Sequence, residues 1–319
     1  MGEESGYRPL LFGPDSRLPD LSSAAIEEFL EQGPVPARWW PRLVAWESRL
    51  LWLLSGSSII VSVATFMLSF VTQMFSGHLG ALELAGASIA NVGIQGLAYG
   101  IMIWYSQGLV LVSGLLPNPT ISLDSISICM NYLNWDIQFM LGLSAAASVR
   151  IGNELGAGHP KVAKFSVIVV NATSIIISIV FSAIVLGFRV GLSKLFTSDT
   201  AVIDAVINLT PLLASSVFLN GIQPILSGVA IGSGWQAIVA YVNLATYYVI
   251  GLPIGCVLGF KTSLGVVGIW SGMIIGVFLQ TVTLIMLTVR TNWDAEVEKA
   301  TERLRISANE EFTALVGAD

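Results

Sequence analysis

The stretch from Ser125 to Pro160 places the strongest constraint on how this chain can fold. Between Ser125 and Val149 the only charged residue is Asp136, and a run of that length can cross a bilayer as a helix. A carboxylate in the middle of such a helix is costly in hydrocarbon, so it should face a bundle interior, a water-filled cavity or a partner group. Asp136 is therefore a candidate functional residue. The alternative is that Asp136 lies near a wet interface or caps a break in the helix, and the residues alone leave both possibilities open.

Composition places the chain among the polytopic membrane proteins. Hydrophobic residues make up 54% of the chain, charged residues make up 11%, and the mean hydropathy is +0.76. Soluble domains, in contrast, carry about 25% charged residues. The net charge of −6 comes mostly from acids in the two tails, which argues against nucleic-acid binding because that function needs a basic face. The expected fold class is therefore all-α, a bundle of membrane-crossing helices.

Uncharged runs predict where the helices cross. The predicted spans cover residues 50–76, 125–149, 165–188, 205–230, 237–260 and 262–289. The glycines in Ile231–Gln236 supply the break between two of these spans. The uncharged run over 84–123 is too long for one simple span and barely long enough for two, so it should form a hairpin or a hybrid helix. The whole bundle is expected over residues 47–290.

The two ends of the chain are expected in the cytosol. Residues 1–46 are polar and acidic and should be loosely ordered, although Ala24–Leu30 could form a short helix. Residues 291–319 return to a charged pattern that suits a surface helix. The loop after the Asp136 helix is the most basic internal loop and should also be cytosolic. Counting back from these assignments, the run over 84–123 starts and ends outside and must cross an even number of times.

Small and polar residues give the first indications of packing and of a cavity. Glycines recur at four-residue spacing, which lets helices approach closely in lipid. The pairs are Gly96 and Gly100, Gly228 and Gly232, Gly251 and Gly255, and the series Gly268, Gly272 and Gly276. Asn220 and Gln223 lie beside Pro224 inside a span, and buried amides need partners. A role in lining a cavity is therefore favoured over a purely structural kink.

Enzyme chemistry finds little support in the sequence. The only histidines, His78 and His159, lie in predicted loops, and no serine or cysteine has a base nearby. Cys129 and Cys256 lie in apolar runs without a further ligand at metal-binding spacing, so they are interpreted as packing residues. Neither an enzymatic activity nor a metal or other cofactor is expected.

Several motifs together resemble the plant branch of the multidrug and toxic compound extrusion (MATE) family, close to the members that load flavonoid conjugates into vacuoles. The matching stretches are WESRLLWLL at Trp46, FSGHLGALELAGASIAN at Phe75, IWYSQGLVLVSGLLPNPTISLDSISICMNYLNWD at Ile103, AAASVRIGNELGAGHP at Ala145 and NGIQPILSGVAIGSGWQ at Asn220. The resemblance implies an antiporter that moves organic substrates against a proton or sodium gradient. It also implies a fold of two six-helix lobes around a central cavity.

The departures from the family pattern are also informative. The chain resembles one nearly complete lobe plus the first helix of the other, with a join near Met102 and Ile103. In the family an acid, a leading candidate for the proton site, stands where this chain has Met102. Many related plant proteins also have aspartate where this chain has Asn220. Asp136 is then the main acidic candidate left inside the bundle.

By this resemblance the chain should exchange protons for an organic solute such as a flavonoid glycoside or a xenobiotic. The expected location is the vacuolar membrane, with the plasma membrane as the alternative. Asp136 would carry the proton, and Asn134, Asn220 and Gln223 would offer polar contacts in the cavity. Alternating access usually moves one repeat against another, so transport by the monomer should be weak or absent. The alternative function is a non-transporting, truncated partner that docks on a full-length homologous transporter.

Overall fold

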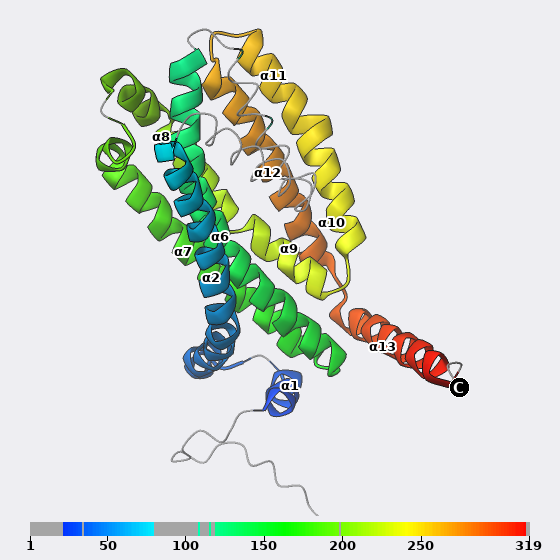
Figure 1. Cartoon of the computed structure of the whole chain (residues 1–319). Coiled ribbons are helices and arrows are strands. Elements are labelled where there is room, and N and C mark those ends of the chain that lie inside the picture. The colour runs from blue at the N-terminus through cyan, green and yellow to red at the C-terminus, as the bar shows by residue number, and fades with distance from the viewer. Residues whose placement is uncertain are drawn as a thin grey trace, which may run out of the picture.

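A computed structural model describes residues 22–33, 35–79, 108, 115, 119–197 and 199–316 of the chain (Figure 1). In these ranges every regular element is a helix, which confirms the all-α class. The main elements are α1 (Ser23–Glu31), α2 (Trp40–Leu79), α6 (Pro119–Gly156), α7 (Pro160–Lys194), α8 (Thr200–Asn220), α9 (Gln223–Gly232), α10 (Gln236–Asn243), the π-helix η3 (Leu244–Gly251), α11 (Leu252–Phe260), α12 (Val266–Arg290) and α13 (Trp293–Val316). A short 3-10 helix, η1 (Ala37–Trp39), precedes α2.

Five stretches of the described chain are long and apolar enough to cross a membrane. They are Ala37–Thr65, Pro160–Lys194, Thr200–Gly232, Gln236–Phe260 and Val266–Arg290. α6 is not among them, because Asn131, Asn134, Asp136 and Gln138 lower its hydropathy. Yet α6 lies inside the bundle, since it packs against α2, α7, α8 and α9. A helix with several polar side chains is thus surrounded by other helices.

The chain turns within the predicted break at Ile231–Gln236, and it has another break ahead of this one, at the end of α8. Gly234, with φ of 82°, lies in the turn between α9 and α10, inside the predicted break at Ile231–Gln236. A second break at Gly221 and Ile222 separates α8 from α9 within the predicted span 205–230. A Cβ on Gly221 would overlap the side chain of Ser178 on α7. This close approach explains why a glycine stands where α8 ends.

Both tails pack onto the same end of the bundle, which also holds the turn between α6 and α7 (Figure 1). The end of α2 and the start of α6 lie at the opposite end (Figure 1). Most of the run over 84–123, together with the join at Met102 and Ile103, lies outside the described residues, so the even number of crossings stays a prediction.

The part of the N-terminal tail that the structure describes is more ordered than expected, because α1 caps α7. The carboxylate of Glu27 accepts hydrogen bonds from the backbone N–H groups of Lys161, at 3.0 Å, and Val162, at 2.7 Å. These N–H groups belong to the first turn of α7, where an anion is favourable. Ile26, 1% exposed, packs beside Glu27 against Val162 and Phe165. Glu27 belongs to the polar N-terminal tail in the sequence, yet its carboxylate holds α1 against the start of α7.

The four-residue glycine spacing produces the close helix contacts that it predicts. A Cβ on Gly228 would overlap Ser144 of α6, and one on Gly232 would overlap Ser148. A Cβ on Gly272 of α12 would overlap the backbone of Gly255 on α11. These contacts involve backbone atoms, which cannot move aside as a flexible side chain can. Gly96 and Gly100 lie outside the described residues.

Replacing Gly272 by alanine should therefore destabilise the bundle, because α11 and α12 must separate to admit the methyl group. We expect a loss of about 1–3 kcal/mol, measured by thermal unfolding in detergent. Gly187→Ala is the matched control, since the space around this glycine in α7 is open. There the higher helix propensity of alanine should leave stability unchanged or raise it by up to about 1 kcal/mol. Equal effects of the two substitutions would contradict the proposed packing.

Candidate functional site

Asp136 lies on the buried face of α6. Cys129, Leu133, Met140 and Leu143 share this face at alternating spacings of four and three residues, which is the pattern of an inward helix stripe. Asp136 falls within the pattern and is 5% exposed. α6 is continuous from Pro119 to Gly156, so Asp136 does not cap a helix break. The structure therefore places this carboxyl group in the bundle interior.

Asn220 is the partner of Asp136. Its side-chain Nδ2 donates a hydrogen bond to Oδ2 of Asp136 at 2.8 Å, although the two residues are 84 positions apart. Asn220 is the last residue of α8, and the break that follows at Gly221 is held close to α7. The contact between α7 and Gly221 thus fixes the place from which the Asn220 amide reaches α6.

The second carboxyl oxygen of Asp136 is the distinctive feature of the site. Oδ1 is buried, and within the described part of the chain no hydrogen-bond donor reaches it. No cation of the described residues forms an ion pair with Asp136. A buried carboxylate with one unmatched oxygen is costly when ionised, whereas a proton on Oδ1 removes the charge. The arrangement is thus suited to binding and releasing a proton.

Two of the residues expected in the cavity do not meet Asp136. Gln223 is 4% exposed, but its Nε2 donates to Oγ of Ser227 at 3.1 Å, within α9 itself. Asn134 lies half-buried on α6, two residues before Asp136. Residues two apart on a helix point to different sides, so Asn134 does not share the Asp136 face. The structure brings together Asp136 and Asn220 and leaves the other two apart.

Sequence reasoning missed a polar pair one helical turn before Asn220. Oγ of Ser216 on α8 accepts a hydrogen bond of 2.8 Å from Nε1 of Trp270 on α12. Trp270 is 1% exposed and Ser216 is 7% exposed. Ser216 and Asn220 are four residues apart, so they lie on one face of α8. The four-residue spacing of Ser216 and Asn220 was visible in the sequence. The face of α8 that carries Asn220 therefore also contacts α12, through Trp270.

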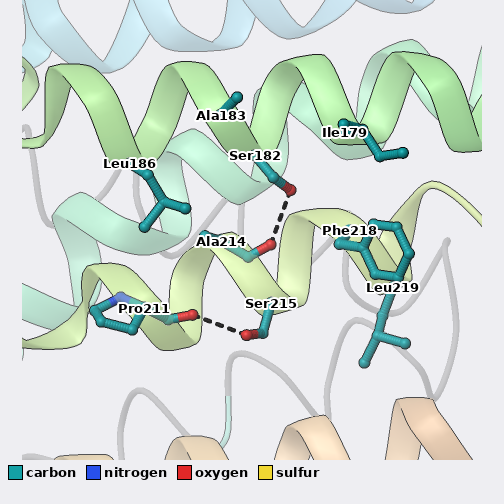
Figure 2. Close-up of a pocket in the computed structure, with 9 residues that line it drawn as sticks. All are labelled: Ile179, Ser182, Ala183, Leu186, Pro211, Ala214, Ser215, Phe218 and Leu219. Atoms are coloured by element: carbon teal, nitrogen blue, oxygen red, sulfur yellow. Dashed lines mark hydrogen bonds between the residues drawn. The ribbon is translucent and has the colours of Figure 1, made fainter.

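A groove between α7 and α8 does not belong to this site (Figure 2). Its volume is about 500 Å³, and its walls include the apolar side chains of Ile179, Leu186 and Phe218. Ser182 donates to the carbonyl of Ala214, and Ser215 donates to that of Pro211, both at 2.9 Å (Figure 2). None of the described residues that line the groove is ionisable. This part of its surface suits hydrocarbon.

A buried ionic cluster lies near the end of α6 that faces the tails. Nε and Nη2 of Arg150 donate to the two carboxylate oxygens of Glu47 on α2, each at 3.0 Å. Nη1 of Arg150 donates to Glu154, one turn further along α6. Arg150, Glu47 and Glu154 are 6%, 2% and 3% exposed. Arg150 is therefore a buried structural residue, although it lies beyond the predicted span, which ends at Val149.

Glu154 connects this cluster to α1 and to the turn before α7. Its carboxylate accepts a hydrogen bond of 2.6 Å from Oγ of Ser23 and lies 2.8 Å from Nδ1 of His159. The i, i+4 spacing of Arg150 and Glu154 was visible in the sequence. The third member, Glu47, lies 103 positions before Arg150 and could only be found from the fold.

The cluster should respond to acid in a defined direction. Burial alone raises the pKa of Glu154, but the bonds from Ser23, Arg150 and His159 outweigh this effect and hold the pKa below the ordinary value of 4.5. A depressed carboxyl pKa stabilises the fold above the unfolded-state pKa, and this stabilisation is lost as the pH falls through the folded-state value. We expect the difference in melting temperature between the wild type and Glu154→Gln to shrink as the pH falls below about 4.5. A difference that stays constant or grows below this pH would contradict the assignment.

Comparisons with known proteins agree with this architecture. The MatE family model matches residues 95–257. The chain is 44% identical to Protein DETOXIFICATION 41 of Arabidopsis thaliana, in an alignment that covers 97% of this chain and 98% of that protein. It is 53% identical to Protein DETOXIFICATION 37 of the same plant over 74% of this chain and 46% of that protein. The crystal structure of the eukaryotic MATE transporter AtDTX14 matches with a TM-score of 0.61 and 42% identity, over 63% of this chain and 45% of that one.

The extent of these matches shows how much of a relative the chain contains. The alignment with DETOXIFICATION 41 extends over 498 positions, whereas this chain has 319 residues, so a large part of that relative lies opposite gaps. The chain spans about half the length of DETOXIFICATION 37 and of AtDTX14. The match of nearly the whole chain to DETOXIFICATION 41 and the shared helical fold lead to one conclusion. The chain belongs to the MATE family of membrane transporters, which move small organic substrates across membranes.

Proposed function

We propose that this chain is a proton-coupled antiporter of organic solutes, such as flavonoid glycosides or xenobiotics, whose activity is reduced because most of one lobe is missing. The observation that carries the proposal is the buried Asp136 carboxyl group, held by Asn220 at one oxygen and unmatched at the other. The resemblance to the vacuolar flavonoid branch supports the substrate class. It also supports the vacuolar membrane as the location, which co-fractionation with a vacuolar rather than a plasma-membrane marker tests.

The proton would act at Oδ1 of Asp136. In the protonated state the carboxyl group is neutral and is tolerated among the apolar residues of α6. Loss of the proton creates a charge that the site does not match, which favours a state that admits water or a polar group of the solute. The Asn220 amide holds Oδ2 in both states. Asn134 and Gln223 remain candidate contacts for the solute in a conformation in which their amides turn to the cavity.

Uptake by the isolated chain tests this proposal. Vesicles that contain only this protein, acidic inside, should accumulate a flavonoid glucoside faster than vesicles without a pH gradient. A protonophore should abolish the difference, because proton exit drives uptake in an antiporter. Gradient-independent uptake would contradict the proton coupling.

The same preparation tests the alternative function. If the chain inserts stably and transports nothing, the proposed antiport by this chain is wrong. Co-purification with a full-length homologous transporter, together with a lower transport rate of that partner, would then support the role of a non-transporting partner. This test is motivated by coverage, because the chain spans only about half the length of DETOXIFICATION 37 and of AtDTX14.

A further inference from the structure

A pocket of about 440 Å³ is lined by residues of α10, the end of α12 and the start of α13. Its apolar wall consists of Ile238 from α10 and Met286 and Leu287 from α12. Arg290 and Lys299 stand at its rim. Arg290 is the last residue of α12 and of a stretch apolar enough to cross a membrane. The pocket therefore lies at the level where lipid headgroups meet water.

The charge at the rim is positive after internal pairing. Glu296, the acid in the pocket lining, is 6% exposed and is fully used: its Oε2 accepts from Nε1 of Trp235 at 3.0 Å, and its Oε1 accepts from Nζ of Lys299 at 2.7 Å. The side chain of Lys299 is 65% exposed and keeps two further N–H groups for a ligand. Among the described residues, no carboxylate lies within 4.0 Å of the Arg290 guanidinium group.

The wall below this rim is suited to a hydrocarbon chain. Ile238 is 45% exposed and Met286 is 48% exposed, so the wall is open to the surroundings of the bundle. Trp235 sits at the edge of the pocket, and tryptophan is enriched at the headgroup level of membranes. An apolar wall that ends in two cations at the membrane surface matches a ligand with an apolar tail and an anionic head.

We propose that this pocket binds an anionic phospholipid, with the headgroup phosphate between Arg290 and Lys299 and an acyl chain along Ile238, Met286 and Leu287. The Glu296 carboxylate positions Lys299 for the phosphate. Because α13 begins at Trp293, shortly after Arg290, a bound lipid joins α13 to the end of α12 and stabilises the contact between the surface helix and the bundle.

Thermal unfolding of the whole purified chain tests the proposal, with native mass spectrometry to count bound lipids. Phosphatidylserine at a tenfold excess over its Kd should raise the melting temperature by roughly 2 °C. Phosphatidylcholine with the same acyl chains should raise it by much less. In Arg290→Gln/Lys299→Gln the affinity for phosphatidylserine should fall roughly 10- to 30-fold. Lys261→Gln/Arg305→Gln removes the same charge outside the pocket and should bind like the wild type.

Three results would overturn the proposal. Equal shifts with the two lipids would indicate a hydrocarbon contact without headgroup selection. A full shift with inorganic phosphate at the same concentration would indicate an anion site that needs no lipid. Equal losses of affinity in the two double variants would indicate a general effect of net charge.

Discussion

Replacing Arg150 by methionine should destabilise the protein by about 3–5 kcal/mol. The substitution leaves Glu47 and Glu154 with buried carboxylates and without the guanidinium group that pairs with both. Removal of one member of a buried ionic cluster costs this much because the remaining charges are no longer compensated. The measurement is thermal or denaturant unfolding in detergent. We expect a lower yield of folded protein as well.

A nearby arginine gives the control for this prediction. Arg49 follows Glu47 closely on α2 but is exposed, so Arg49→Met should change stability by no more than about 0.5 kcal/mol. The triple replacement of Glu47, Arg150 and Glu154 by methionine should recover most of the loss, since it leaves no unpaired buried charge. If Arg150→Met behaved like Arg49→Met, the cluster would not contribute to the fold.

Replacing Asp136 by asparagine should reduce uptake driven by a pH gradient to background. Asparagine keeps the size and the hydrogen-bonding capacity of the protonated acid, but it cannot exchange a proton. Stability should be unchanged or slightly higher, because the variant has no buried carboxylate to ionise. Parallel measurements of uptake and melting temperature separate a lost proton site from a lost fold.

Two further variants sharpen this result. Asp204→Asn removes an acid of α8 that is exposed, and it should leave uptake as in the wild type. Asn220→Asp places a second carboxyl group in hydrogen-bonding contact with Asp136. Because two carboxylates so close together share a proton, uptake by this variant should require a higher external pH for proton release. Loss of uptake in Asp204→Asn would show that the effect of Asp136→Asn is not specific.

The all-α class and the turn at Gly234 could be predicted from the sequence, because uncharged length and glycine placement are local properties of the chain. The contacts between the helices are not local. The same logic singled out Asp136 and Asn220 separately. Their hydrogen bond depends on how α6 packs against the end of α8, which the Gly221 contact sets. Periodicity along one helix carries no information of that kind.

The polar contacts of two other residues also depend on the packing. Gln223 is buried at the start of α9, and its amide donates to Ser227 of the same helix. Arg150 follows the predicted span 125–149 directly, where its charge favours a cytosolic loop, yet Glu47 of α2 pairs with it inside the protein. A charge pattern alone cannot distinguish a solvated arginine from a paired one, since the partner is distant in the chain.

Release of protons on substrate binding tests the role of Asp136 most directly, because it does not require a complete transport cycle. The chain in weakly buffered detergent, with a pH-sensitive dye, is mixed with a flavonoid glucoside at a pH at which Asp136 is protonated. We predict that the wild type releases about one proton per bound substrate, whereas Asp136→Asn binds substrate and releases none. Equal proton release from both proteins would contradict the assignment of Asp136 as the coupling acid.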